Sequence, residues 1–410
     1  MKQLSVRIVL GFASAAFAGL FASPVFSQNA NWVTAWGTSQ QSLAETKISN
    51  ASVRMIARVT LPGDAVRIRL DNNFGKTPVT FDHVTLGPRV RGPALAVGLV
   101  KPVTFGGKGS VIVPAGGTVE SDAIAMHVDA QQDLGVSLFV SGADVQPSQH
   151  TNAQVTSYLT DNEAGDSTGA ADGKAFTGKT IAMFWLKSID VRPTGPASSI
   201  IAFGDSITDG TCTTLDAHDR WEDIVSNRLA MQASIRRAIV NEGIGGNTVI
   251  NAAGYNPPIG SPTGVDRLDR DVLSHAGISH VVLFEGTNDI ARGATADQLI
   301  AGMKDIITRV HAKGLKIIGV TILPRKNAYP IAGTLALFDE QKTKVKNAVN
   351  AWIRKDAGFD AVLDFDRVVR DPDSPDVIQQ AYGCGDGVHP SPIGYFQMGK
   401  SVNLAVFGAR

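Results

Sequence analysis

The sequence predicts a protein in two parts, an antiparallel β-sandwich or jelly roll followed by an α/β domain with a parallel sheet. Between Asn31 and about Val191, short runs of alternating apolar and polar residues are separated by Gly, Pro, Asn and Asp. Such spacing is typical of antiparallel strands. After residue 198, short apolar runs alternate with helical stretches, which indicates a parallel sheet with helices on both faces.

Residues 1–27 have the pattern of a secretory signal peptide. Lys2 and Arg7 precede an apolar stretch over residues 8–22, and modest side chains stand at Val25 and Ser27, where a signal peptidase would read them. The alternative is a membrane anchor, which is disfavoured because the apolar run is short for a span. We therefore expect a periplasmic or secreted protein without a membrane span.

The β-domain is predicted to occupy residues 28–190. Its strands are expected at Val53–Val59, Val66–Leu70, Val79–Phe81, Ser110–Val113 and Val136–Val140. The segment 161–179 is rich in Gly, Asp, Ser and Thr, which suits either a calcium loop or a solvated loop. The solvated loop is favoured because no calcium-ligand spacing is present.

The α/β domain is predicted at residues 199–410, after a linker at 191–198 that contains two prolines and a glycine. Ligands bind such sheets at the carboxyl ends of the strands. The expected strands are Ser199–Phe203, Ala238–Val240, His280–Phe284, Lys316–Leu323 and Val362–Phe365. The expected helices are Trp221–Met231, Val265–Ser274, Ala296–Lys313, Leu335–Arg354 and Ile393–Val406. The third helix is marked by a capping-box pattern at Thr295 and Gln298 and by Gly314 at its end.

Three residues in this domain suggest a nucleophile with its base and acid. Ser206 follows a buried strand and a glycine, which would deliver its hydroxyl at the strand end. A serine hydroxyl needs a base within hydrogen-bond reach, and the base needs an orienting partner. His389 and Asp386 are three residues apart and supply that pair. Taken alone, Ser206 would be a turn former, and Asp386 and His389 a capping acid and a surface histidine.

Two further motifs supply hydrogen-bond donors for a developing oxyanion. Gly246 lies in a glycine-rich turn after a strand, where glycine lets the backbone come close to a ligand. Asn288 follows the next predicted strand. The backbone N–H groups of Ser206 and Gly246 and the side-chain amide of Asn288 together form the predicted oxyanion hole. The alternatives are a simple β–α turn for the glycines and a helix cap for Asn288.

These motifs together resemble the SGNH hydrolase, or GDSL esterase/lipase, superfamily. The resemblance rests on Gly204-Asp205-Ser206, Gly246, Gly286-Thr287-Asn288-Asp289 and Asp386-Gly387-Val388-His389, and it covers the chain from about Ser199 onward. It implies a flavodoxin-like three-layer fold and ester hydrolysis by a Ser–His–Asp triad without a metal or other cofactor. With the β-rich first half included, the chain resembles the two-domain branch that contains xylan acetylesterases.

Two cysteines follow the predicted signal peptide, and both lie near the motifs. Cys212 comes six residues after Ser206, and Cys384 comes two before Asp386. Because an exported protein meets an oxidising compartment, we expect a disulfide that ties the serine loop to the acid–base loop. Two unpaired thiols are the alternative.

The substrate is expected to be a short-chain ester, acetyl esters of carbohydrates or simple alcohols above all. The pocket wall is predicted in the loops around Trp221, Tyr255, Arg325 and Tyr329, whose side chains suit either sugar stacking or framework packing. No long apolar lid is evident for long acyl chains. The formal net charge of +0 argues against nucleic acid as a partner. The alternatives are a lipase, arylesterase or thioesterase of the same fold, or a glycan-binding protein with an idle hydrolase domain. The β-domain either binds polysaccharide or buttresses the catalytic domain.

Overall fold

This computed structural model describes Met1 and residues 32–232, 236–251, 261–326, 337–355 and 357–408. Apart from Met1, the predicted signal peptide lies outside these residues. Residues 31–410 form one compact unit. Among the described residues, no helix has the length and apolar character required to cross a membrane.

The first part of the compact unit is rich in β-strands, and its described strand pairs are antiparallel, as the alternating pattern predicts. Its strands are β1 Val33–Gly37, β2 Ser42–Leu43, β3 Ala51–Val59, β4 Gly63–Asp71, β5 Val79–Phe81, β6 His83–Arg91, β7 Ala94–Leu95, β8 Lys101–Pro102, β9 Val111–Val113, β10 Thr118–Glu120, β11 Ile124–Val128, β12 Gln132–Val140, β13 Ser148–His150, β14 Ser157–Leu159, β15 Gly178–Thr180, β16 Met183–Phe184 and β17 Leu186–Val191.

Two larger sheets organise this β-rich part. One has the order β1-β17-β4-β10 with β11 also on β4, and the other has the order β15-β14-β3-β12-β6-β7 with β8 also on β6. Alternate residues of β3 and β4, such as Val53 and Ile68, enter one apolar cluster that also contains Trp185. The shared cluster is the core of this part. The jelly-roll connectivity is not confirmed by these pairings and stays a prediction.

The second part is an α/β fold around one parallel sheet. The strands lie in the order β19-β18-β20-β21-β22, which is the 2-1-3-4-5 order of a doubly wound sheet. Its strands are β18 Ser198–Gly204, β19 Arg237–Gly243, β20 Ile278–Phe284, β21 Lys316–Val320 and β22 Ala361–Leu363. Its helices are α1 Ser206–Asp209, α2 Trp221–Ala230, α3 Gly264–Arg267, the π-helix η1 Leu268–Leu273, α4 Thr287–Ala291, α5 Ala296–Ala312, α6 Glu340–Lys355, α7 Phe365–Val369, α8 Pro392–Ser401 and the 3₁₀ helix η2 Leu404–Phe407.

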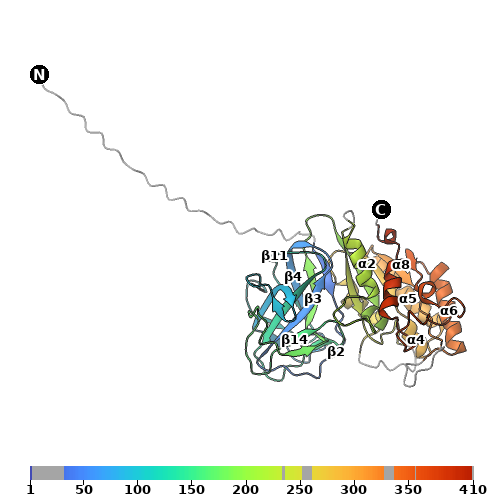
Figure 1. Cartoon of the computed structure of the whole chain (residues 1–410), viewed down its shortest axis with the longest axis horizontal. Helices are drawn as coiled ribbons and strands as arrows, with labels where there is room; N and C mark the ends of the chain where they lie inside the picture. The colour runs from blue at the N-terminus through green and yellow to red at the C-terminus, as the bar shows by residue number, and fades with distance from the viewer. Residues whose placement is uncertain (2–31, 233–235, 252–260, 327–336, 356, 409–410) are drawn as a thin grey trace. The chain divides into compact units, whose positions relative to one another are not determined.

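Both faces of this sheet are buried. Successive residues of a strand point to opposite sides of the sheet, and helices cover each side. In β18, Ile200 and Ala202 enter an apolar cluster with residues of α2 and α8, whereas Ile201 and Phe203 enter a cluster with residues of η1, α5 and α6. The helices belong to the green-to-red part of the chain in Figure 1. The near-continuous apolar runs of these strands follow from this double burial.

Several predicted elements differ in their extent. The helix predicted at Val265–Ser274 is α3 followed by a π-helix, and the predicted strand Lys316–Leu323 ends at Val320. Phe365 begins α7 instead of ending a strand, and its ring packs against Trp221 and Phe284. The predicted last helix is divided into α8 and η2. The first residues of the predicted helix Leu335–Arg354 lie outside the described part, and α6 begins at Glu340.

The β-rich and α/β parts are joined by polar contacts, some of them fully buried. The Thr60 hydroxyl donates to the carbonyl of Ile239 in β19 at 2.9 Å, and Lys187 of β17 pairs with Asp271 of η1 at 3.2 Å between buried side chains. Residues 192–197, within the predicted linker, connect β17 to β18. The division into two domains at 191–198 stays a prediction.

Candidate active site

The turn after β18 holds Ser206 at the start of α1. Asp205 caps this helix, and its Oδ1 accepts the N–H of Ile207 at 3.0 Å. A Cβ on Gly204 would lie 2.2 Å from Thr208 Oγ1, so the tight turn admits only glycine at that position. Ser206 is 8% exposed. The sequence therefore places this hydroxyl at the carboxyl end of the strand, as predicted.

The loop before α8 brings an acid and a base to this hydroxyl. His389 Nε2 lies 2.8 Å from Ser206 Oγ, and His389 Nδ1 lies 2.5 Å from Asp386 Oδ2. The other oxygen of Asp386 accepts the backbone N–H groups of Val388 at 2.8 Å and His389 at 2.9 Å. Because a carboxylate only accepts, Nδ1 carries a proton, and in the neutral imidazole Nε2 then accepts from the Ser206 hydroxyl. The three side chains form one directed series of hydrogen bonds.

The charge state of Asp386 is set by the same contacts. Burial would raise the pKa of this carboxyl, but the hydrogen bond and charge of His389 and the two backbone N–H groups outweigh it and lower the pKa to about 2. Asp386 is therefore ionised at any pH at which the folded protein would work.

The predicted oxyanion groups lie on the turns after β18, β19 and β20. Ser206 opens α1, so its N–H belongs to the first turn, where backbone donors have no acceptor within the helix. Gly246 adopts φ +76° in the turn after β19. Asn288 Nδ2 donates to the carbonyl of Asn247 at 2.9 Å, which places Asn288 beside the Gly246 turn. An amide has two N–H donors, and this contact uses one of them.

Buried carboxyl groups stabilise these turns. Asp289 accepts the N–H groups of Val249 and Ile250 at 3.0 and 3.1 Å, which ties α4 to the loop after β19. Burial raises the pKa of Asp289 to about 7 and that of Asp205 to about 8. Glu285 pairs with Arg267 at 3.0 Å, both side chains being fully buried. The pairing of Arg267 with Glu285 was not predicted, although Glu285 directly precedes the Gly286-Thr287-Asn288-Asp289 motif, because the two residues are 18 positions apart and neither marks its partner.

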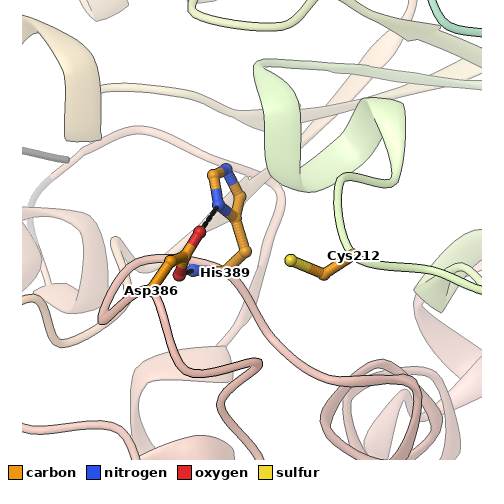
Figure 2. A group of neighbouring side chains, drawn as sticks. All are labelled: Cys212, Asp386 and His389. Atoms are coloured by element: carbon orange, nitrogen blue, oxygen red, sulfur yellow. Dashed lines mark hydrogen bonds and ion pairs between the residues drawn. The ribbon is translucent and has the colours of Figure 1, made fainter. Parts of the chain in front are cut away.

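The predicted disulfide between Cys212 and Cys384 is confirmed. Cys212 Sγ, a carboxylate oxygen of Asp386 and a ring nitrogen of His389 lie within 4.8 Å of one another, and Figure 2 shows Cys212 beside the hydrogen-bonded pair. Metals bind the thiolate form of cysteine, which a disulfide sulfur does not offer, while Asp386 and His389 bond to each other. This group is therefore better described as a covalent tie beside an acid–base pair. The expected independence from metals stays a prediction.

Removing this disulfide should destabilise the protein. The chain-entropy model gives about 5 kcal/mol for so long a closed loop, and native disulfides commonly contribute roughly 2–5 kcal/mol. The Cys212→Ser/Cys384→Ser variant should therefore unfold at lower temperature and denaturant concentration than the oxidised wild type. Dithiothreitol should lower the unfolding temperature of the wild type to that of the variant and leave the unfolding temperature of the variant unchanged. Equal unfolding curves for oxidised wild type and variant would contradict this expectation.

The four residues predicted to line the substrate pocket differ in where they lie. Trp221 is 1% exposed and packs edge-on against Phe365, with ring centroids 5.5 Å apart, so it is framework and not pocket wall. Arg325 is also buried, and its Nη1 donates to the hydroxyl of Thr287 at 3.0 Å. Burial lowers the pKa of Arg325 to about 10. Tyr255 and Tyr329 lie outside the described residues.

The α/β part of the chain matches one known protein family. Residues 202–396 match the model of the GDSL-like lipase/acylhydrolase family. These residues are therefore a GDSL-like lipase/acylhydrolase domain, and the chain is a carboxylic ester hydrolase. The match contains the Ser206, Gly246 and Asn288 turns and the Asp386–His389 loop.

Solved structures similar to this chain include a carbohydrate acetylesterase from Sinorhizobium meliloti, at 19% identity and TM-score 0.40, over 51% of this chain and 98% of the other. They also include a GDSL-like lipase from Bacteroides thetaiotaomicron, at 20% identity and TM-score 0.36, over 52% of this chain and 89% of the other. No curated protein matched the chain in the sequence comparison.

Proposed function

We propose that this chain is an exported serine esterase that removes short acyl groups, acetyl above all, from carbohydrate or simple alcohol esters. The observation that carries the proposal is the series of hydrogen bonds from Ser206 through His389 to Asp386. A serine hydroxyl becomes a nucleophile when a base takes its proton, and this base has its tautomer held by an ionised carboxylate.

In the proposed mechanism, Ser206 Oγ attacks the ester carbonyl carbon while His389 Nε2 takes the hydroxyl proton. The resulting oxyanion accepts hydrogen bonds from the backbone N–H groups of Ser206 and Gly246 and from the Asn288 amide. His389 then gives its proton to the leaving alcohol, and an acyl-serine remains. Water, deprotonated by His389, attacks the acyl-serine, and the acid and free Ser206 are released.

Fewer observations support the choice of acyl group and alcohol in the proposed substrate. The loops after the strands contain no long apolar segment to cover an extended acyl chain, which favours small acyl groups. Export is supported by the N-terminal sequence pattern and by the disulfide, which persists in oxidising compartments. An exported esterase meets acetylated polysaccharide outside the cytoplasm, so a carbohydrate acetyl ester is the preferred substrate.

The test is acetate release from acetylated xylan, with the Ser206→Ala protein as the blank. A second arm compares p-nitrophenyl esters of two to twelve carbons. We expect acetate release by the wild type alone and a rate that falls as the acyl chain lengthens. Preference for the longest chains would establish the lipase alternative. Binding to xylan without turnover of any ester would establish the alternative of a glycan-binding protein with an idle site.

The proposed oxyanion hole predicts a large effect at Asn288. Replacing Asn288 by alanine should lower kcat by about 100- to 1000-fold, with a smaller change in KM, because the lost donor acts mainly on the transition state. Steady-state kinetics on the preferred ester measure both constants. The matched control is Asn347→Ala in α6. It removes an exposed side-chain amide that donates to Asp376 at 3.1 Å. A kcat for Asn288→Ala within a few-fold of the control would remove Asn288 from the oxyanion hole.

A further inference from the structure

A histidine from the β-rich part reaches the first helix of the α/β part. His150 ends β13, and its side chain is 2% exposed. Its Nδ1 lies 2.9 Å from the carbonyl oxygen of Ser39, and its Nε2 lies 3.0 Å from Asp209 Oδ1 and 3.2 Å from the carbonyl oxygen of Asn152. Carbonyl and carboxylate oxygens only accept hydrogen bonds. Both ring nitrogens must therefore donate, so His150 is an imidazolium.

The carboxylate that receives this imidazolium holds a second turn. Asp209 is the last residue of α1, and its Oδ2 accepts the backbone N–H of Gly245 at 2.9 Å. The backbone of α1 packs closely on the end of β19, since a Cβ on Gly243 would lie 2.2 Å from the backbone nitrogen of Asp209. Asp209 thus joins the helix that begins at Ser206 to the turn that contains Gly246.

We infer that His150 is a positioning residue for the oxyanion hole: it holds Asp209, and Asp209 sets the spacing between the Ser206 and Gly246 N–H donors. The inference rests on the proposed function, because it assigns these two donors to the oxyanion. It gives the β-rich part a share in catalysis through a single buried ion pair, whether or not that part also binds glycan.

The electrostatics of the pair make this link sensitive to substitution. Burial alone would lower the pKa of His150, but the charge and hydrogen bond of Asp209 outweigh it and raise the pKa. Removing one member of a buried pair leaves the other charge uncompensated. Without the imidazolium, Asp209 is expected to turn toward other partners, such as the nearby Arg220, whose Nε already donates to the Asp209 carbonyl at 2.7 Å. The Gly245 N–H would then lose its acceptor.

The experiment compares His150→Gln and His150→Leu with a matched control, Thr60→Val. Thr60 also bonds from the β-rich part to the α/β part, and the described hydrogen bonds of its hydroxyl go to Ala35 and to Ile239 in the middle of β19, not to Asp209. We expect both His150 variants to lower kcat by roughly 10- to 100-fold with KM within about threefold, since donors misplaced for the oxyanion affect mainly the transition state. Affinity for a boronic acid that mimics the tetrahedral intermediate should fall by a similar factor. Thr60→Val should keep the wild-type kcat and the wild-type affinity for the boronic acid.

Hydrogen exchange supplies a readout that does not depend on turnover. The backbone amides of residues 243–248 should exchange faster in His150→Gln than in the wild type and in Thr60→Val. Unchanged exchange and kcat in His150→Gln would overturn the inference, as would an equal loss of kcat in Thr60→Val. If His150→Leu does not fold, His150→Gln decides alone. A wild type that hydrolyses no ester, combined with the expected exchange difference, would overturn the proposed function and leave the structural link standing.

Discussion

Replacing Ser206 by alanine is expected to lower kcat for ester hydrolysis on the order of 10⁵- to 10⁶-fold, because the nucleophile of a serine hydrolase has no substitute. The fold should persist, since the Ser206 side chain makes its described hydrogen bond only to His389. Initial rates on a short-chain ester measure the loss, and circular dichroism and the unfolding midpoint measure the fold.

A serine outside the site provides the control for this substitution. Ser401 lies at the end of α8, where its hydroxyl donates to the carbonyl of Met398 at 2.7 Å. Ser401→Ala should keep wild-type turnover. Turnover of Ser206→Ala within tenfold of Ser401→Ala would show that another group attacks the ester.

Replacing Asp386 by asparagine is expected to lower kcat by about 10⁴-fold, because the neutral amide no longer fixes the Nδ1–H tautomer of His389 or stabilises its imidazolium. The carboxylate has a pKa of about 2 in the folded protein. Its ionisation therefore contributes nothing to the pH dependence of the wild type between pH 4 and 9, and loss of activity on acidification within that range must come from another group.

Asp371 offers a control with the same turn geometry. Its Oδ1 accepts the backbone N–H groups two and three residues later, Asp373 and Ser374, both at 2.9 Å, as Asp386 does for Val388 and His389. Asp371→Asn tests the effect of this change on such a turn without a histidine partner. If both variants kept wild-type kcat, Asp386 would be a capping residue and not part of the catalytic machinery.

The sequence was sufficient for the features that depend on local pattern. The strand before Ser206, the glycine-rich turn at Gly246 and the Asp386–His389 spacing each carry a signal within a few residues, and the parallel sheet follows from the apolar runs. The disulfide was predictable because both cysteines flank those motifs.

Features set by long-range packing were beyond the sequence. Trp221 begins a predicted helix, and its burial and its aromatic contact with Phe365 reveal that it is core. The contact between His150 and Asp209 joins residues 59 positions apart in different parts of the chain, and neither residue type marks its partner. Buried pairs of this kind depend on how two sheets meet, which no local pattern encodes.

The central claim is that Ser206 is the nucleophile, and trapping it covalently is the most direct test. The protein is treated with a fluorophosphonate, digested, and mapped by mass spectrometry, with the Ser206→Ala and Ser401→Ala proteins treated alongside. We predict one adduct, on Ser206, in the wild type and in Ser401→Ala, and none in Ser206→Ala. An unmodified Ser206 in protein that hydrolyses esters, or an adduct at another residue that persists in Ser206→Ala, would contradict the account.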